Sequence, residues 1–135
     1  MPRRPFDHEK LKVYQASLRF IAWATELLDR VPKQAAVHNQ LDRASTSIPL
    51  NIAEGTAKFT PPDRCRFFDT ARGSAVERAA CLDVLVAKNL CKAPEVETGK
   101  ETLGEIVAML VGLLKANAPD RPFPRGPQEQ VQVQD

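Results

Sequence analysis

Residues 7–29 read DHEKLKVYQASLRFIAWATELLD and have the pattern of one long helix. Apolar side chains recur in it at spacings of three and four residues, which is the period of an amphipathic α-helix. Nowhere in the chain do apolar and polar residues alternate over six positions between turn residues, as they would in a half-buried strand. The sequence therefore predicts an all-α protein whose first helix runs from about Asp7 to Asp29, with Asp7 as its N-cap.

Proline and glycine divide the rest of the chain into three more helical segments. We expect these helices at about Gln34–Glu54, Pro62–Lys92 and Glu95–Asn117. Gly55 is predicted to end the second helix in a left-handed conformation, and Pro94 separates the third helix from the fourth. Helices joined by such short connections predict an up-down-up-down antiparallel four-helix bundle.

The composition describes one domain with a tail. The chain has 135 residues, of which 43% are apolar and 27% charged, as is typical of a globular protein. Residues 1–117 are expected to form the bundle, whereas residues 118–135, rich in proline and glutamine, are expected to form a flexible tail. The sequence has neither a signal-peptide pattern nor a segment apolar enough to cross a membrane, so we expect a cytoplasmic protein with no membrane partner.

The first helix has two apolar stripes instead of one. The first stripe consists of Leu11, Tyr14, Leu18, Ile21, Ala22, Thr25 and Leu28. The second consists of Val13, Ala16, Phe20, Trp23, Ala24 and Leu27. A helix that is apolar on two faces is buried on both, so we expect a homo-oligomer with Val13, Phe20, Trp23 and Leu27 at the contact between subunits. The alternative is that the tail or the loops cover this face.

The second helix contains a proline inside a helical pattern, in the run SIPLNIAEG at residues 47–55. Pro49 predicts a kink, because it lacks an amide hydrogen and clashes with the preceding turn. Glu54 lies one turn after Asn51, at a helix end where a negative charge is unfavourable. We therefore expect a cationic partner for Glu54, and Arg72 is the candidate.

The third helix has an unusually small middle, ARGSA at residues 71–75. Gly73 lowers helix propensity by about 1 kcal/mol relative to alanine. We interpret this patch as a place where a neighbouring backbone comes close.

Three segments make the chain resemble a known family. They are QLDRASTSIPLNIAEG at residues 40–55, the opening at residues 6–15, and ARGSAVE at residues 71–77. Over residues 6–117 the chain resembles the four-helix-bundle proteins encoded in 23S rRNA intervening sequences. The resemblance implies a ring-like homopentamer associated with RNA or DNA. A related branch, the accessory proteins of diversity-generating retroelements, has a reverse transcriptase as its partner.

Catalytic and metal-binding patterns are absent from the sequence. Cys65, Cys81 and Cys91 lie far apart, and His8 and His38 are isolated, so no set has the spacing of zinc ligands. The sequence also has no glycine-rich phosphate loop, no paired-histidine metal motif and no G-x-S-x-G. We expect a protein that is not an enzyme and that needs no metal or cofactor.

Charge leaves three functional interpretations open. The formal net charge is only +2, yet residues 1–60 contain more basic than acidic residues. Lys12, Arg19 and Arg30 are the candidate contacts to RNA or DNA, and a cyclic oligomer would repeat them on every subunit. They could equally be solvated surface charges. The third interpretation is a scaffold that docks another protein and does not bind nucleic acid.

Overall fold

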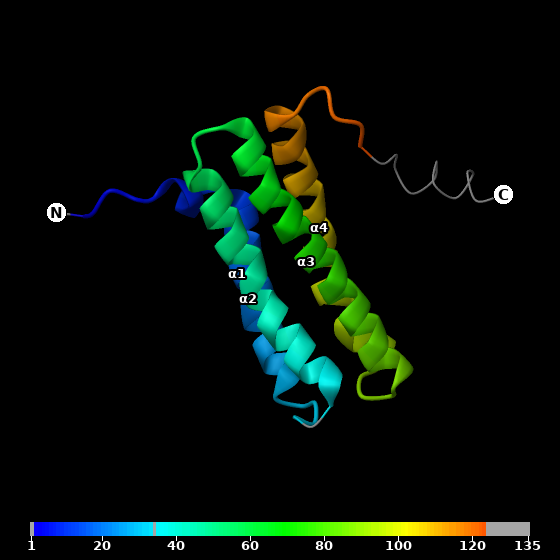
Figure 1. Cartoon of the computed structure of the whole chain (residues 1–135). Coiled ribbons are helices and arrows are strands. Elements are labelled where there is room, and N and C mark those ends of the chain that lie inside the picture. The colour runs from blue at the N-terminus through cyan, green and yellow to red at the C-terminus, as the bar shows by residue number, and fades with distance from the viewer. Residues whose placement is uncertain (1, 34, 124–135) are drawn as a thin grey trace.

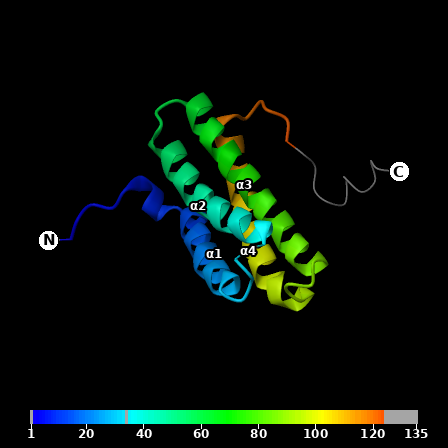
Figure 2. The same cartoon turned by 60° about the horizontal axis from the view of Figure 1, so that its bottom comes forward.

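The protein folds into four packed helices. The computed structural model describes residues 2–33 and 35–123. Its elements are the short 3-10 helix η1 (Asp7–Lys10) and the helices α1 (Lys12–Leu28), α2 (Ala36–Ala57), α3 (Pro61–Ala87) and α4 (Ala93–Asn117). No strand occurs within the described ranges, and consecutive helices run in opposite directions (Figure 1). Both α1 and α3 contact α2 and α4, so the four helices enclose one core (Figure 2). The predicted all-α fold of four packed helices is confirmed.

The first predicted helix is divided in two. The 3-10 turn η1 ends at Lys10. The backbone of Leu11 is then extended (φ −81°, ψ 130°), and α1 begins only after it. The side-chain amide of Gln15 donates to the carbonyl oxygen of Glu9 at 3.1 Å and ties the two pieces together. Asp7 is the first residue of η1 and not the N-cap of α1, so that prediction is wrong.

Two predicted helix ends are also wrong, and each has a local cause. Gly55 does not cap α2; it lies inside the helix, and no described glycine has a positive φ. α3 ends at Ala87 and not at Lys92, because Asn89 adopts the left-handed conformation with φ 60°. The amide of Leu90 then donates to the carbonyl oxygen of Leu85 at 2.9 Å, which closes the end of the helix.

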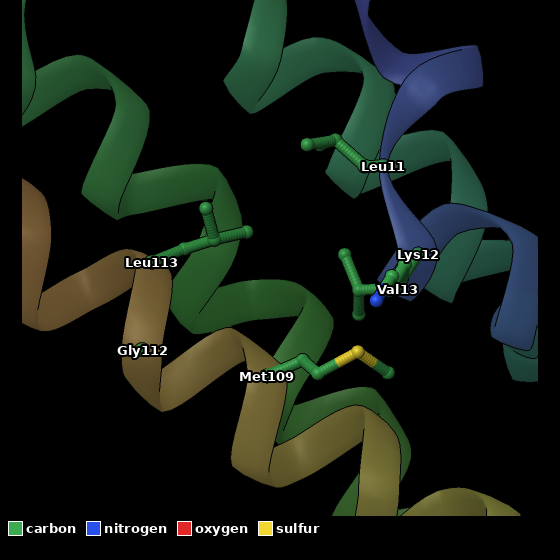
Figure 3. Close-up of a pocket in the computed structure, with 6 residues that line it drawn as sticks. All are labelled: Leu11, Lys12, Val13, Met109, Gly112 and Leu113. Carbon is green, nitrogen blue, oxygen red and sulfur yellow. The ribbon is translucent and has the colours of Figure 1, made fainter.

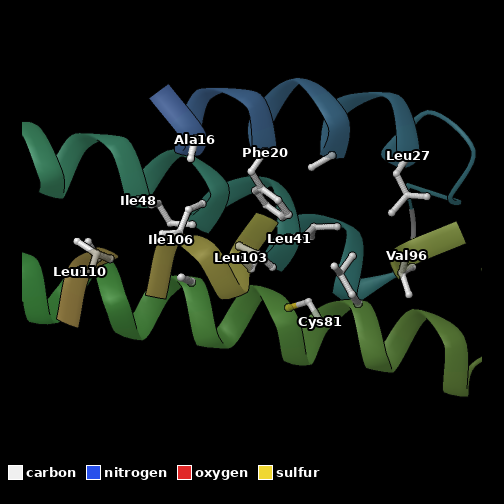
Figure 4. Packing of buried hydrophobic residues seen from close by; sticks show 14 of the residues in the cluster. Ala16, Phe20, Leu27, Leu41, Ile48, Cys81, Val96, Leu103, Ile106 and Leu110 are labelled. Atoms are coloured by element: carbon white, nitrogen blue, oxygen red, sulfur yellow. The ribbon is translucent and has the colours of Figure 1, made fainter. Parts of the chain in front are cut away.

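The core lies along the axis between the four helices (Figure 4). Phe20, Leu41, Ile48, Leu82 and Leu110 are among the side chains with no exposed surface. Pro49 is buried within α2, which continues beyond it to Ala57. A kink at this proline stays a prediction.

The beginning of the predicted tail packs on the bundle. The guanidinium of Arg121 donates to both carboxylate oxygens of Asp69, each at 2.8 Å, and this raises the pKa of Arg121 above its ordinary value. Phe123 is partly buried against the core. Arg121, shortly after the end of α4, therefore contacts α3, and the flexibility predicted for residues 118–135 stays a prediction. The rest of the predicted tail, residues 124–135, lies outside the described residues.

Candidate binding surfaces

The two apolar stripes of α1 have the opposite roles from those predicted. Val13, Phe20 and Leu27 are 3%, 0% and 1% exposed, so they belong to the core of the single chain. Their assignment to a contact between subunits is therefore wrong. The stripe containing Leu18 is the outer one, and Leu18 itself is 45% exposed. Helical spacing finds both stripes, but which one faces inward depends on where α2 and α4 dock.

Trp23 belongs to the contact between α1 and α4. Its side chain is half-buried and lies beside Phe20, with 5.7 Å between the ring centroids. A β-carbon at Gly99 of α4 would collide with the indole ring, so the glycine makes room for it. Trp23 thus packs mainly within its own chain, whereas the prediction placed it between chains.

An apolar groove opens at the other end of the same contact (Figure 3). It has a volume of about 240 Å³ and lies where α1 begins and α4 nears its end. Its lining residues are Leu11, Lys12, Val13, Met109, Gly112 and Leu113. Apart from Lys12, these residues offer only apolar side chains or backbone, so the groove suits an apolar side chain.

The three basic residues nominated for nucleic-acid contact all lie at the surface. Lys12 and Arg19 are exposed on α1, and their spacing of seven residues places them on the same side of the helix. Arg30 is exposed as well, but its Nη1 lies 3.2 Å from Oε2 of Glu95 at the start of α4, so its charge is partly neutralised. On its outer side α4 has a line of exposed acids, Glu97, Glu101 and Glu105.

The predicted cluster at the end of α2 does not form as expected. Glu54 lies 3.7 Å from Nζ of Lys58, one turn later on its own helix. Arg72 makes no ion pair within the part of the chain that the structure describes. Asp83, eleven residues after Arg72 and on the same side of α3, pairs with Lys100 of α4 at 2.7 Å. Arg72 therefore belongs to the side of α3 that faces α4, which separates it from Glu54.

The remaining members of that motif join α2 to α3. Asn51 Nδ2 donates to the carbonyl oxygen of Ser47 at 2.8 Å and to its Oγ at 3.0 Å. Ser47 Oγ in turn lies 2.9 Å from Ser74 Oγ of α3. Gly73 is exposed and a β-carbon there would meet nothing within 4 Å, so the interpretation of Gly73 as a close-approach site is wrong.

Gly55 is where the backbones of α2 and α3 come close. A β-carbon at this position would lie 2.7 Å from Cε1 of Phe68 and 3.1 Å from the carbonyl oxygen of Arg64. Phe68 is 2% exposed and has no room to move. The glycine in this motif therefore serves packing and not helix termination.

Arg78 is a functional candidate that the sequence patterns above do not nominate. Its side chain is fully buried in the contact between α2 and α3, and its Nη1 donates to the carbonyl oxygen of Gln40 at 2.6 Å. Its Nη2 lies 3.3 Å from Oε1 of Glu77, without hydrogen-bond geometry, and neither Nη2 nor Nε has a hydrogen-bond partner. The signal was present, because Arg78 lies at helical spacing from Ala75 and Leu82 in the predicted core stripe.

A polar groove surrounds this arginine. It has a volume of about 370 Å³ and is lined by Gln40, Arg43, Ser47, Ser74, Glu77 and Arg78. The groove thus contains two guanidinium groups against one carboxylate. Such a site has the chemistry of an anion-binding pocket and lacks a nucleophile beyond serine hydroxyls.

The thiols of two cysteines are shielded by burial. Burial raises the pKa of the Cys81 and Cys91 thiols, which disfavours their reactive thiolate forms. The described residues contain no group of three or more His, Cys, Asp or Glu side chains placed to hold a metal ion. Within those same ranges, no helix has the length and apolar character needed to cross a membrane.

Comparisons with known proteins identify the fold and the family. One solved structure that matches is that of a protein of unknown function from the S23 ribosomal protein family of Bacteroides thetaiotaomicron. It is 24% identical, with a TM-score of 0.71 over 76% of this chain and 98% of that chain, and so supports the fold. No curated protein matches the chain. Residues 9–112 match the family described as 23S rRNA-intervening sequence protein. The chain therefore belongs to the 23S rRNA-intervening sequence protein family.

Proposed function

We propose that this protein is a non-enzymatic, homo-oligomeric helical bundle that associates with RNA or DNA. The observation that carries the proposal is the pair Lys12 and Arg19, which are exposed two turns apart on α1. Neither forms an ion pair with another described residue. Two such cations on one side of a helix suit successive phosphates of a nucleic-acid backbone, which bind without sequence preference.

Self-association supports this function in two ways. Among the described residues, six large apolar side chains are exposed, namely Phe6, Leu18, Leu50, Phe59, Val76 and Val84. Burying part of this surface against another copy would be favourable. A ring would also repeat the Lys12–Arg19 pair on each subunit and strengthen the field that attracts phosphate. The resemblance to intervening-sequence proteins implies five subunits.

A charge-reversal experiment tests the nucleic-acid proposal. Binding of a fluorescently labelled RNA is measured by anisotropy over a range of salt concentrations, for the wild type and for Lys12→Glu with Arg19→Glu. We expect the double variant to bind at least about tenfold more weakly at low salt and to show a shallower salt dependence, because phosphate contacts are lost.

The matched control is Lys88→Glu with Lys92→Glu, which makes the same change of charge at exposed positions between α3 and α4. This control should retain most of the binding. Equal losses of RNA affinity in both double variants would show that binding depends only on the overall charge of the protein. That result would contradict the role of α1.

A protein-docking scaffold is the second candidate function, and the apolar groove between α1 and α4 favours it. The groove could accept an apolar side chain of another protein (Figure 3). In that case Met109→Glu would abolish the association with the protein partner, whereas Arg19→Glu, which lies outside the lining of the groove, would leave it intact. If Lys12→Glu with Arg19→Glu abolishes binding of nucleic acid and Met109→Glu leaves that binding intact, the first function is supported.

A further inference from the structure

Arg78 has a buried edge whose hydrogen-bond donors have no partners. In a guanidinium group, the Nε hydrogen and one hydrogen of Nη2 point in the same direction and form a fork that matches two oxygens of an oxyanion. These are the two nitrogens of Arg78 without hydrogen-bond partners, whereas Nη1 is bound to α2. Burial without partners is unfavourable for donors, so this edge has a strong tendency to acquire an anionic partner.

Other donors surround the same groove. Arg43 contributes a second guanidinium from the exposed side of α2, and Gln40 contributes an amide. Because Asn51 donates to Ser47 Oγ, the hydroxyl hydrogen of Ser47 can be donated to Ser74 Oγ. The hydroxyl hydrogen of Ser74 is then available to a ligand in the groove. One face of the α2–α3 contact therefore gathers donors of three kinds.

The carboxylate of Glu77 lies near the unpartnered edge of Arg78 but only partly satisfies it. Its carboxylate lies 3.3 Å from Nη2 of Arg78 but lacks hydrogen-bond geometry, and its side chain is 58% exposed. Such a side chain can swing into solvent at little cost. A ligand with more negative charge and better geometry would displace it from the edge of Arg78.

We propose that the groove between α2 and α3 binds a phosphate group, either free inorganic phosphate or the terminal phosphate of a nucleotide. Arg78 binds two phosphate oxygens through Nε and Nη2, Arg43 closes over the group from the solvent side, and Ser74 donates to a third oxygen. Glu77 moves away when the phosphate enters. The site is built from α2 and α3 and does not use Lys12 or Arg19, so it is independent of the proposed association with RNA or DNA.

Isothermal titration calorimetry at low ionic strength tests the proposal with two probes, inorganic phosphate and adenosine monophosphate. We expect saturable binding of inorganic phosphate at one site per subunit in the wild type. Glu77→Gln should bind several-fold more tightly because a competing carboxylate is removed. Arg43→Gln should bind about tenfold more weakly, since one charge-assisted hydrogen bond is lost. Tighter binding of adenosine monophosphate than of phosphate would identify a nucleotide as the source of the group.

Arg66→Gln is the matched control, because Arg66 is an exposed arginine of α3 that pairs with Asp63 outside the groove. It should bind phosphate as the wild type does. Arg78→Lys keeps the charge but lacks the fork, so it should bind weakly while circular dichroism shows an unchanged fold. Two results would overturn the proposal: no saturable binding to the wild type and Glu77→Gln in the millimolar range, or equal weakening by Arg43→Gln and Arg66→Gln.

Discussion

The contact between α2 and α3 and the contact between α1 and α4 are built on different principles. At the first, a glycine brings two helix backbones together, and a pair of serines and a buried arginine join them through polar contacts. At the second, a tryptophan lies in the space over a glycine, and an apolar groove remains open beyond it. The α2–α3 contact therefore holds its two backbones at a fixed distance and leaves only exposed side chains such as Arg43 and Glu77 free to move, whereas the α1–α4 contact can adapt to another chain.

We expect the largest change in the free energy of unfolding when the aromatic ring that fills the core beside α1 is removed. Phe20→Ala should lower the free energy of unfolding by about 3–5 kcal/mol, because it leaves a cavity at a fully buried position. Leu18→Ala, on the outer stripe of the same helix, should change it by less than about 0.5 kcal/mol. Urea denaturation measures both, and equal effects would contradict the inward orientation of the Phe20 stripe.

Gly55→Ala tests the close contact between α2 and α3. The added β-carbon would meet the buried ring of Phe68 and the backbone of Arg64, neither of which can move away. We expect a loss of about 2 kcal/mol in the free energy of unfolding, since overpacking outweighs the gain in helix propensity. An unchanged or raised stability in thermal denaturation would show that α2 and α3 are not held at this distance.

Gly99→Ala makes the same chemical change at the looser contact. The added β-carbon would meet the far end of the Trp23 ring, which is only half-buried and can tilt toward solvent. We expect a smaller loss of about 1 kcal/mol, accompanied by a red shift of tryptophan fluorescence as the ring becomes more exposed. If Gly99→Ala lowered the free energy of unfolding more than Gly55→Ala does, the α1–α4 contact would be the tighter of the two.

Gly73→Ala is the reference for both glycine variants. Gly73 is exposed, and nothing lies within 4 Å of an added β-carbon. The substitution should raise the free energy of unfolding by about 0.5–1 kcal/mol through helix propensity alone. A destabilised Gly73→Ala protein, measured under the same urea conditions, would mean that another subunit or segment covers this position.

The sequence allowed the four helices to be predicted because their apolar spacing is local information. It did not allow the inner and outer stripes of α1 to be distinguished, since Phe20 and Leu18 differ only in which neighbouring helices reach them. Gly55 was interpreted as a cap because glycine often ends helices, and only the position of Phe68 reveals its packing role. Arg78 has core spacing but a polar side chain, and its burial depends on carbonyl oxygens of another helix.

The most direct test of the account is size-exclusion chromatography with light scattering, at low and at high salt, with the ratio of absorbance at 260 and 280 nm recorded. We expect a mass several times the 15.0 kDa of one chain, together with nucleic acid that is present at low salt and removed at high salt. A particle of 15.0 kDa without nucleic acid at low salt would contradict it.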